Sequence, residues 1–439
     1  MKVAVIGSGI AGLSAAWLLS SRHEVTLFEK SAALGMDAHS IDIETAEGTA
    51  RIDVPLRVFF PGYYPNITAL YHELQIDFEP INYSASFGLL DRKTHFRFDN
   101  YRIGRLVLPF LKGRHVFNRT ALRIGLDNLR FFRELSSTLA SNGIEADMTL
   151  SDFIAAKNYS QEYAEGFLYP AFAGICTCHI DSVKAYPARM ILEYLNSDLL
   201  LRSVQRVTLG TREVVARLAK DVCSVRLNAN VTAVDATANG VTVQSANDVS
   251  EFDHAVVATQ ANQTLGLLQG VAREDRRVLN QFDYEPSQVV MHTDERLAPI
   301  GGRSQWAPVN FIANDRQSTP MATIWLNSIQ DLPGEQPVFQ TWNPIRRPAP
   351  ETILAQAAFE RPVVTAQSLA ALSDLTALHE EPNRRVWYCG SYASRGIPLL
   401  ESAANSAFAV AEKLRCQRPW RRVGTTASTR DLVAGPSIL

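Results

Sequence analysis

The sequence predicts an α/β protein in which a parallel sheet is combined with a second, discontinuous domain of mixed sheet and helices. Three observations lead to this prediction. The chain has 439 residues, well above the roughly 150 residues of a typical domain. It begins with a strand, a glycine-rich turn, a helix and a second strand within its first thirty residues. A further strand, glycine and helix follow over residues 386–414, so both ends of the chain are expected to share one sheet.

Composition excludes several classes of protein. Hydrophobic residues make up 46% of the chain and charged residues 20%, which is ordinary for a folded, soluble protein. No apolar run approaches the roughly 18 residues of a membrane span. The 43 Lys and Arg balance 45 Asp and Glu, so no nucleic-acid partner is expected. Five scattered cysteines, and a start without the long apolar core of a signal peptide, predict a cytoplasmic location.

The first thirty residues carry the strongest functional signal. Residues 3–6 are typical of a buried parallel strand, residues 13–20 of a helix and residues 25–28 of a second strand. Between the first strand and the helix lies the turn Gly7-Ser8-Gly9-Ile10-Ala11-Gly12. In a dinucleotide-binding unit the first glycine permits the tight turn, the second lets the pyrophosphate approach the backbone, and the third lets helix and strand pack closely. The helix N-terminus then offers free N–H groups to the pyrophosphate.

An acid closes the second strand. Glu29 lies 17 residues after Gly12, where a carboxylate accepts hydrogen bonds from ribose hydroxyls and repels a 2′-phosphate, which disfavours NADP. The complete order of strand, turn, helix, strand and acid predicts a Rossmann-like dinucleotide-binding domain. The alternative is a glycine turn that holds no nucleotide, which fits a lone motif better than a motif in this full context.

Further segments decide between NAD and FAD through a family resemblance. They are a glycine segment at 34–39, a helix start at 207–211, short strands at 225–228 and 230–234, a strand ending in Ala-Thr at 255–259, and the final strand, glycine and helix at 386–391 and 402–414. Over residues 1–416 the chain resembles the FAD-dependent amine oxidase and phytoene desaturase superfamily. Within it, the chain looks closest to the group of predicted NAD/FAD-binding oxidoreductases, on the segments 64–70, 324–327, 341–344 and 388–392.

The resemblance implies an FAD site built from both ends of the chain. In the superfamily the last strand and helix hold the isoalloxazine ring and ribityl chain, and the equivalent of Val231 holds the adenine through its backbone. Two positions depart from the family: Met36-Asp37 stands where Gly-Arg is usual, with Arg51 as a stand-in for that arginine, and Ser391 stands where an acid is usual. The implied cofactor residues are Gly7, Gly9, Ile10, Ala11, Gly12, Glu29, Lys30, Gly35, Met36, His39, Val231, Ala258, Gly390, Ser391, Ser402 and Ala403.

These cofactor segments divide the chain into interleaved parts. We expect residues 1–54, 203–268 and 380–416 to form the FAD-binding domain, and residues 55–202 and 269–379 to form the substrate domain. Apolar spacing predicts helices at 67–74, 120–140 and 150–156, and strand-like runs lie at 288–292, 322–326 and 338–342. Residues 417–439 are predicted to be a flexible tail.

The distribution of lysine argues against an ordinary amine oxidase. Amine oxidases of the superfamily commonly place a lysine near flavin N5, on a strand of the second insertion, where it helps oxygen react. This chain has no Lys between Lys220 and Lys413, and an arginine cannot give up its proton at ordinary pH. Dehydrogenation with another acceptor, or redox-neutral isomerisation, is therefore favoured, unless Lys93 or Lys184 fills the same space.

Three side chains are candidates for the catalytic site. His179 follows Cys176 and Cys178. Its side chain could line a pocket, where it could exchange a proton near neutral pH. Trp325 and Tyr392 could form aromatic walls over the flavin. Each has a structural alternative, a buried patch of small residues around His179 and ordinary core for the two aromatic residues. The Cys-x-Cys-His spacing fits no common metal pattern, so no metal is expected.

A basic and apolar stretch spans residues 102–133. It contains eight basic residues, one acid, Asp127, and interleaved apolar residues. Such a stretch can dock on anionic lipid or guide an acidic amphiphile inward, or it can be a solvated helical face. We therefore expect peripheral membrane contact through this stretch, beside a lipophilic small-molecule substrate.

Together these features predict an FAD-dependent oxidoreductase that removes hydride from a C–H or C–N bond of a lipophilic metabolite. Two alternatives stay open. One is a flavin-dependent double-bond isomerase, which returns the hydride at another carbon. The other is a non-catalytic, flavin-bound partner of a lipid-modifying enzyme.

Overall fold

The computed structural model describes residues 1–421 apart from 46, 90, 92, 105, 141–143, 146, 198–202, 238, 247, 270–272 and 315–316. Most of the predicted tail, residues 422–439, lies outside the described residues. The beginning of that tail is packed, because Trp420 stacks on Trp17 with ring centroids 6.1 Å apart and Arg418 pairs with Glu412 at 2.8 Å. The prediction of a flexible segment is therefore wrong for residues 418–420.

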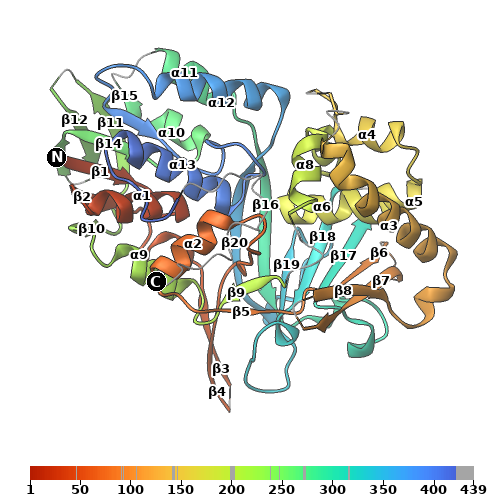
Figure 1. Ribbon diagram of the computed structural model, residues 1–439. Coiled ribbons are helices and arrows are strands. Elements are labelled where there is room, and N and C mark those ends of the chain that lie inside the picture. The colour runs from red at the N-terminus through yellow and green to blue at the C-terminus, as the bar shows by residue number, and fades with distance from the viewer. Residues whose placement is uncertain are drawn as a thin grey trace, which may run out of the picture.

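A five-stranded parallel sheet joins the two ends of the chain, as predicted (Figure 1). The glycine turn leaves the middle strand, so the strand ends that surround it come from residues far apart in the sequence. In spatial order the strands are β10 (Ser224–Arg226), β2 (Glu24–Phe28), β1 (Lys2–Ile6), β14 (His254–Val257) and β21 (Val386–Tyr388).

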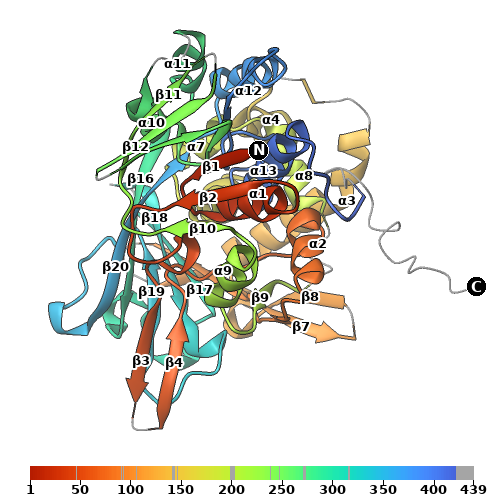
Figure 2. The ribbon, with the colours of Figure 1, turned by 90° about the vertical axis from the view of Figure 1, so that its left-hand side faces the viewer.

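The two faces of this sheet are covered differently. Because side chains alternate along a strand, Val3 and Val5 face one core cluster and Ala4 and Ile6 face another. The first cluster includes α1 (Ile10–Ser20), α9 (Thr211–Ala219) and α13 (Leu400–Lys413). The second includes residues of β11 (Val231–Ala236), β12 (Val241–Ser245), β13 (Asp248–Phe252), β15 (Leu268–Gln269), α10 (Ala261–Leu267), α11 (Arg273–Leu279) and α12 (Ala366–Leu378). Figure 2 shows β11 and β12 beside α10 and α11.

A second, eight-stranded mixed sheet combines two distant stretches of sequence. The strand pair β17–β6 is parallel and joins the two stretches, whereas the other neighbouring pairs are antiparallel. In spatial order the strands are β20 (Ile353–Pro362), β16 (Tyr284–His292), β19 (Phe339–Trp342), β18 (Gln317–Trp325), β17 (Val309–Asn314), β6 (Ala85–Gly88), β7 (Thr94–Ile103) and β8 (Leu106–Leu111).

The helices of the first insertion that follow α2 lie on the side of this second sheet, on the right in Figure 1, whereas α2 packs on α13. The three helices predicted from apolar spacing are present as α2 (Pro65–Glu73), α3 (Arg119–Ala140) and α4 (Leu150–Ala156). Short helices follow: α5 (Gln161–Tyr163), a π-helical turn (Ala164–Leu168), α6 (Tyr169–Cys176), α7 (Ile180–Ala185) and α8 (Ala188–Leu195). Two small antiparallel pairs complete the fold, β3 (Ile41–Thr45) with β4 (Gly48–Ile52) and β5 (Phe78–Pro80) with β9 (Gln205–Val207).

A buried carboxylate ties the first insertion to the end of the chain. Glu401, in the first turn of α13, accepts hydrogen bonds from the backbone N–H groups of Asn66 and Ile67, each at 3.0 Å. These N–H groups belong to the first turn of α2, where an acceptor is needed. Among the described residues, no helix is both long and apolar enough to cross a bilayer.

Candidate active site

The glycine turn has the geometry that its sequence predicts. Gly7 has φ +95°, a conformation that side chains disfavour. A Cβ placed on Gly12 would lie 1.8 Å from the carbonyl oxygen of Gly7, so this position admits no side chain. At Gly9, by contrast, nothing lies within 4 Å of such a Cβ, and the residue lines a cavity. The backbone is therefore packed tightly behind the turn and left open in front of it.

The N-terminus of α1 faces this open space. Gly9 is its N-cap residue, no side chain caps the helix, and no acidic residue lies in its first turn. Ile10 and Ala11, which begin the helix, are buried, and both line the cavity. Uncapped N–H groups at the positive end of a helix dipole form a binding site for an anion such as a pyrophosphate.

Glu29 is buried at the end of β2 and is linked to the turn. Its carboxylate accepts the N–H and the hydroxyl of Ser8, at 3.1 and 2.5 Å, and the N–H of Ser31 at 2.8 Å. The Ser8 hydroxyl oxygen in turn accepts the N–H of Gly35 at 2.8 Å. Ser8 was not predicted as a site residue, although its place inside the glycine turn was the available signal. The acid, the turn and the segment at 34–39 are thus one hydrogen-bonded unit.

Arg51 does not take the position expected of a pyrophosphate arginine. Its guanidinium donates to both carboxylate oxygens of Asp37, at 2.9 and 2.8 Å, and to Asp42 at 2.9 Å. The Arg51 hydrogen bond lowers the pKa of Asp42. Because two carboxylates already balance its charge, Arg51 is a structural residue that fixes the β3–β4 hairpin, and the expectation of a stand-in was wrong.

The far end of the chain closes the site. After β21, Gly390 and Ser391 line the same cavity as Gly9, together with Ala258 from the end of β14 and Ala403 from α13. Ser406 of α13 accepts the N–H of Gly390 at 2.9 Å and donates to its carbonyl, which anchors this loop. Gly35 and Met36 also line the cavity.

Other predicted cofactor residues lie away from the cavity wall. Lys30 and His39 line a more open hollow with Gln260. Val231 belongs to the second core cluster, and the Ser402 hydroxyl is buried and donates to the carbonyl of Ile397 at 2.8 Å. Their assignment to FAD stays a prediction.

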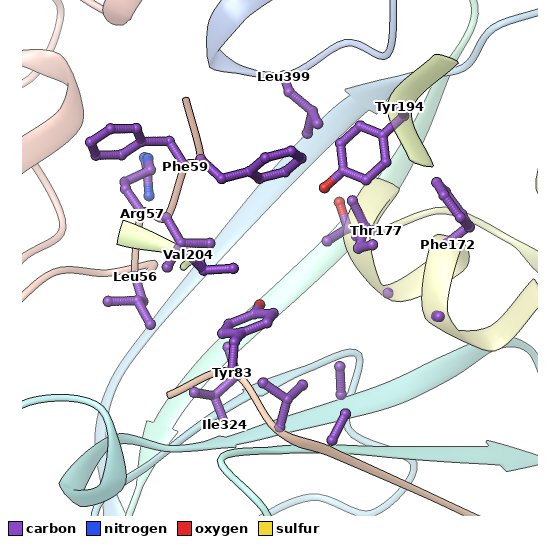
Figure 3. A pocket seen from close by; sticks show the side chains of 18 of the residues that line it. Leu56, Arg57, Phe59, Tyr83, Phe172, Thr177, Tyr194, Val204, Ile324 and Leu399 are labelled. Atoms are coloured by element: carbon purple, nitrogen blue, oxygen red, sulfur yellow. The ribbon is translucent and has the colours of Figure 1, made fainter. Parts of the chain in front are cut away.

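The cavity has a volume of about 970 Å³ and continues from the glycine turn into an apolar chamber. Figure 3 shows the chamber, with the Tyr83 and Tyr194 hydroxyls turned toward its middle. Burial raises the pKa of Tyr83 to about 12, so this phenol is neutral at ordinary pH. The chamber walls include Phe60, Tyr64, Tyr83, Phe87, Phe96, Phe172, Tyr194, Ile324, Trp342 and Phe359.

The cavity wall carries an unusual set of charges. Within the described part of the chain, its lining contains no Asp, Glu, His or Lys, and its charged side chains are Arg57, Arg102 and Arg361. Burial, and then the neighbouring Arg361, lowers the pKa of Arg57 to about 10. Burial also lowers the pKa of Arg361, whose guanidinium lies 5.6 Å from the centre of the Trp342 ring.

Arg57 and Arg361 are the two inner arginines of the cavity, and the charge of Asp53 partly offsets that of Arg57 without an ion pair. No ion pair with a described carboxylate is present for Arg57 or Arg361; Arg57 donates to the carbonyl of Pro55, and Arg361 Nε is buried without a hydrogen-bond partner. Neither Arg57 nor Arg361 was predicted as a site residue. The signal for Arg57 was a single charge inside the apolar run 54–60.

Two of the three catalytic candidates lie outside the cavity wall. His179 is the N-cap residue of α7. Its backbone N–H donates to the Glu285 carboxylate at 2.6 Å, and its side chain is 43% exposed. Trp325 packs on Trp306 with ring centroids 5.5 Å apart, whereas the preceding residue, Ile324, lines the cavity. Strand alternation therefore turns Trp325 to the opposite face of the sheet. Both predictions of a role in the pocket were wrong.

Tyr392 is the candidate that the fold places in the cavity. It is buried, and it lines the wall beside Gly390. Cys389, one residue before the glycine, is a buried core thiol whose pKa burial raises to about 12. Among the described residues, no cluster of His, Cys, Asp and Glu is arranged to hold a metal ion.

Comparisons with known proteins agree with this architecture. Residues 5–74 match the family described as an NAD(P)-binding Rossmann-like domain. A CLA-producing fatty acid isomerase from P. acnes superposes with a TM-score of 0.64 at 13% identity, covering 93% of this chain and 98% of that chain. No curated protein matches the chain by sequence.

Two oxidoreductases superpose over a similar extent. An oxidoreductase from Methanosarcina mazei has a TM-score of 0.63 at 12% identity, over 94% of this chain and 100% of that one. Putrescine oxidase bound to putrescine has a TM-score of 0.60 at 12% identity, over 95% and 100%. The chain thus shares the overall fold of these solved structures, a Rossmann-like domain with a parallel sheet joined to a mixed sheet and helices, which confirms the fold class drawn from the sequence.

Proposed function

We propose that the protein is an FAD-dependent oxidoreductase that removes hydride from a lipophilic small molecule. The observation that carries this proposal is the continuous cavity, which begins at the uncapped turn of a dinucleotide-binding unit and ends in an apolar chamber. Ligand sites of this kind lie where two domains meet and are mostly apolar with a few polar groups.

The residues at the nucleotide end fit FAD. The first turn of α1 would receive the pyrophosphate, because its N–H groups are uncapped and Gly9 leaves open space. Glu29 would accept ribose hydroxyls, with Ser8 holding its carboxylate in place. Gly390, Ser391 and the start of α13 would hold the flavin ring. Bound FAD supplies the hydride acceptor, and the protein supplies binding, orientation and exclusion of water.

The charges of the cavity favour a C–H bond over a C–N bond as the site of reaction. A cationic amine would find no described carboxylate in the wall and would meet two partly buried guanidinium groups, which repel it. Among the described residues, the wall also has no Lys, His or carboxylate that could act as a base near neutral pH. The aromatic walls can position an apolar chain and keep the reacting carbon dry.

The two inner arginines support a further statement about the substrate. A partly buried cation without an ion pair costs free energy, and this cost is offset when a ligand brings an anion. We therefore propose that the substrate is an acidic lipophile whose carboxylate, or a similar anion, pairs with Arg57 and Arg361. Guanidinium groups suit carboxylates because their donors match the two oxygens.

Double-bond isomerisation is the second candidate, and the same cavity favours it. An apolar chamber whose described lining contains no base suits a reaction in which hydride leaves one carbon and returns to another. One of the proteins that share the fold is a fatty acid isomerase, which motivates the test for this chain.

One experiment separates these reactions. Purified protein is loaded with FAD and mixed anaerobically with unsaturated fatty acids, and the visible flavin band and the products are followed. Lasting bleaching with an oxidised product supports the oxidoreductase, and transient or no net bleaching with a shifted double bond supports the isomerase. Protein that takes up no FAD would exclude both.

A further inference from the structure

The far end of the cavity opens in a cluster of exposed apolar side chains. Nine of the seventeen large apolar residues that are exposed among the described ones lie between Tyr101 and Leu129. Phe117, in the 3₁₀ turn Gly113–Phe117, is 87% exposed, and Ile103 at the end of β7 is 61% exposed. Single exposed apolar residues are ordinary, but a contiguous group marks an interaction surface.

Helix α3 supplies one side of this cluster. Leu122, Leu126 and Leu129 recur at helical spacing and are 43%, 68% and 70% exposed. Arg119 and Arg123 lie on the adjoining stripe of the helix, since they precede the leucines by three residues. The opposite face is buried through residues such as Ile124 and Phe131. An exposed stripe of leucine beside a stripe of arginine is the pattern of a helix that lies in a membrane interface.

The same leucines also line the cavity, together with Val107 and Leu111 of β8. The apolar cluster therefore surrounds the mouth of the chamber. In Figure 1, α3 and β8 lie at the right, away from strands β1 and β2 at the left. A lipophilic ligand entering here would meet a mostly apolar lining, in which Asn100, Arg102 and Asn128 are the polar residues of β7 and α3.

The positive charges around the apolar cluster favour an anionic partner. Arg102, Arg119 and Arg133 are exposed, and no ion pair with a described carboxylate engages them. Nearby acids are occupied: Asp99 pairs with Arg97 and Lys112, Asp127 accepts Ser160, and Glu134 pairs with Arg130. Apolar side chains ringed by unpaired arginines complement a leaflet with anionic lipids. A bilayer also leaves the mouth open to an apolar phase, whereas a folded protein seated there would close it.

We propose that the surface around the mouth, formed by β7, β8, the turn at 113–117 and α3, docks on an anionic membrane leaflet, and that the substrate enters the chamber from that leaflet. Substrate entry rests on the proposed function, whereas docking does not. Arg105, and the side chain of Arg114, belong to the same stretch of sequence but lie outside what the structure describes.

Sedimentation with vesicles tests this proposal on the full chain. The vesicles contain either phosphatidylcholine alone or phosphatidylcholine with phosphatidylglycerol, at low and high salt. We expect binding to the anionic vesicles only, weakened by salt. Each arginine near the surface is worth about 1 kcal/mol, so the double variant Arg119→Glu, Arg133→Glu should bind at least about tenfold more weakly.

The apolar part is tested by Ile103→Ser and Phe117→Ser, two exposed positions that do not line the cavity. Val249→Ser, on β13 and 62% exposed, is the matched control. We expect the first two to lose vesicle binding and the control to keep it, with the melting temperature unchanged in all three. The proposal would be overturned if the parent protein did not bind vesicles, or if Val249→Ser lost binding as much as the other two variants. It would also be overturned if the protein bound no vesicles but formed a dimer that Phe117→Ser dissociates. FAD content is measured in parallel, so a failure of the flavin assignment is seen separately.

Discussion

The Glu29 carboxylate holds Ser8 by two hydrogen bonds, one from its backbone N–H at 3.1 Å and one from its hydroxyl at 2.5 Å. The acid that would bind ribose is thus fixed to the turn that would bind pyrophosphate. Both contacts are buried, and Ser31 adds a third donor. The site is preorganised by one carboxylate, so its charge should matter more than its size.

Replacing that charge gives the first prediction. Glu29→Gln keeps the shape but has one acceptor oxygen for three donors, so we expect FAD affinity to fall about tenfold or more. Flavin content and fluorescence titration measure it. Glu24→Gln, at the exposed start of the same strand, is the control and should bind FAD normally. Equal FAD affinity in both variants would contradict the dinucleotide assignment.

The two glycines around the turn should respond in opposite ways. Gly12→Ala places a Cβ against the Gly7 carbonyl, so we expect a loss of unfolding free energy of about 1–3 kcal/mol or more. Gly9→Ala meets nothing within 4 Å and should fold normally, whereas Gly9→Val should fold but exclude FAD. Thermal unfolding and flavin content distinguish the three variants. A Gly12→Ala protein as stable as the parent would show that the close approach is wrong.

Substitution of Arg57 or Arg361 should weaken substrate binding and leave FAD binding unchanged. For Arg57→Gln and Arg361→Gln we expect the KM for an acidic lipophile to rise about tenfold to hundredfold, because a charged hydrogen bond is lost. Without substrate both variants should melt at or above the parent temperature, since a partly buried cation without an ion pair is removed. Arg347→Gln, which is exposed, is the control. Loss of flavin in the inner variants would assign the arginines to the cofactor instead.

Flavin reduction should depend little on pH between about 6 and 9. The pKa of Arg57 is lowered only to about 10, so it stays protonated below that pH, and the pKa of Tyr83 is raised to about 12, so it stays neutral. No described Asp, Glu, His or Lys lines the cavity. Anaerobic stopped-flow measurements across this range check the prediction, and a step near pH 7 would reveal a titrating group that the wall lacks.

The sequence predicts the nucleotide half well because local rules determine it. A glycine turn between a strand and a helix constrains its own geometry, and both Gly7 and Gly12 have the predicted roles. The lining of the apolar chamber depends on which face of a strand points into the cavity. Trp325 and Ile324 are neighbours, and only the tertiary register decides that Ile324 lines the cavity.

The charged partners of the arginines also could not be predicted from the sequence. Arg51 looked available for a phosphate, but the β3–β4 hairpin brings Asp42 opposite it and Asp37 beside it. Arg57 and Arg361 lie 304 positions apart in the chain, and only the fold brings them into electrostatic contact. Long-range proximity of this kind has no signature in a single sequence.

The most direct test of the proposed function is anaerobic titration of the FAD-loaded protein with a long-chain unsaturated fatty acid. The proposal predicts one FAD per chain and substrate-dependent change of the flavin or of the double bond, abolished by Gly9→Val. A protein that is colourless after expression and takes up no added FAD would contradict it.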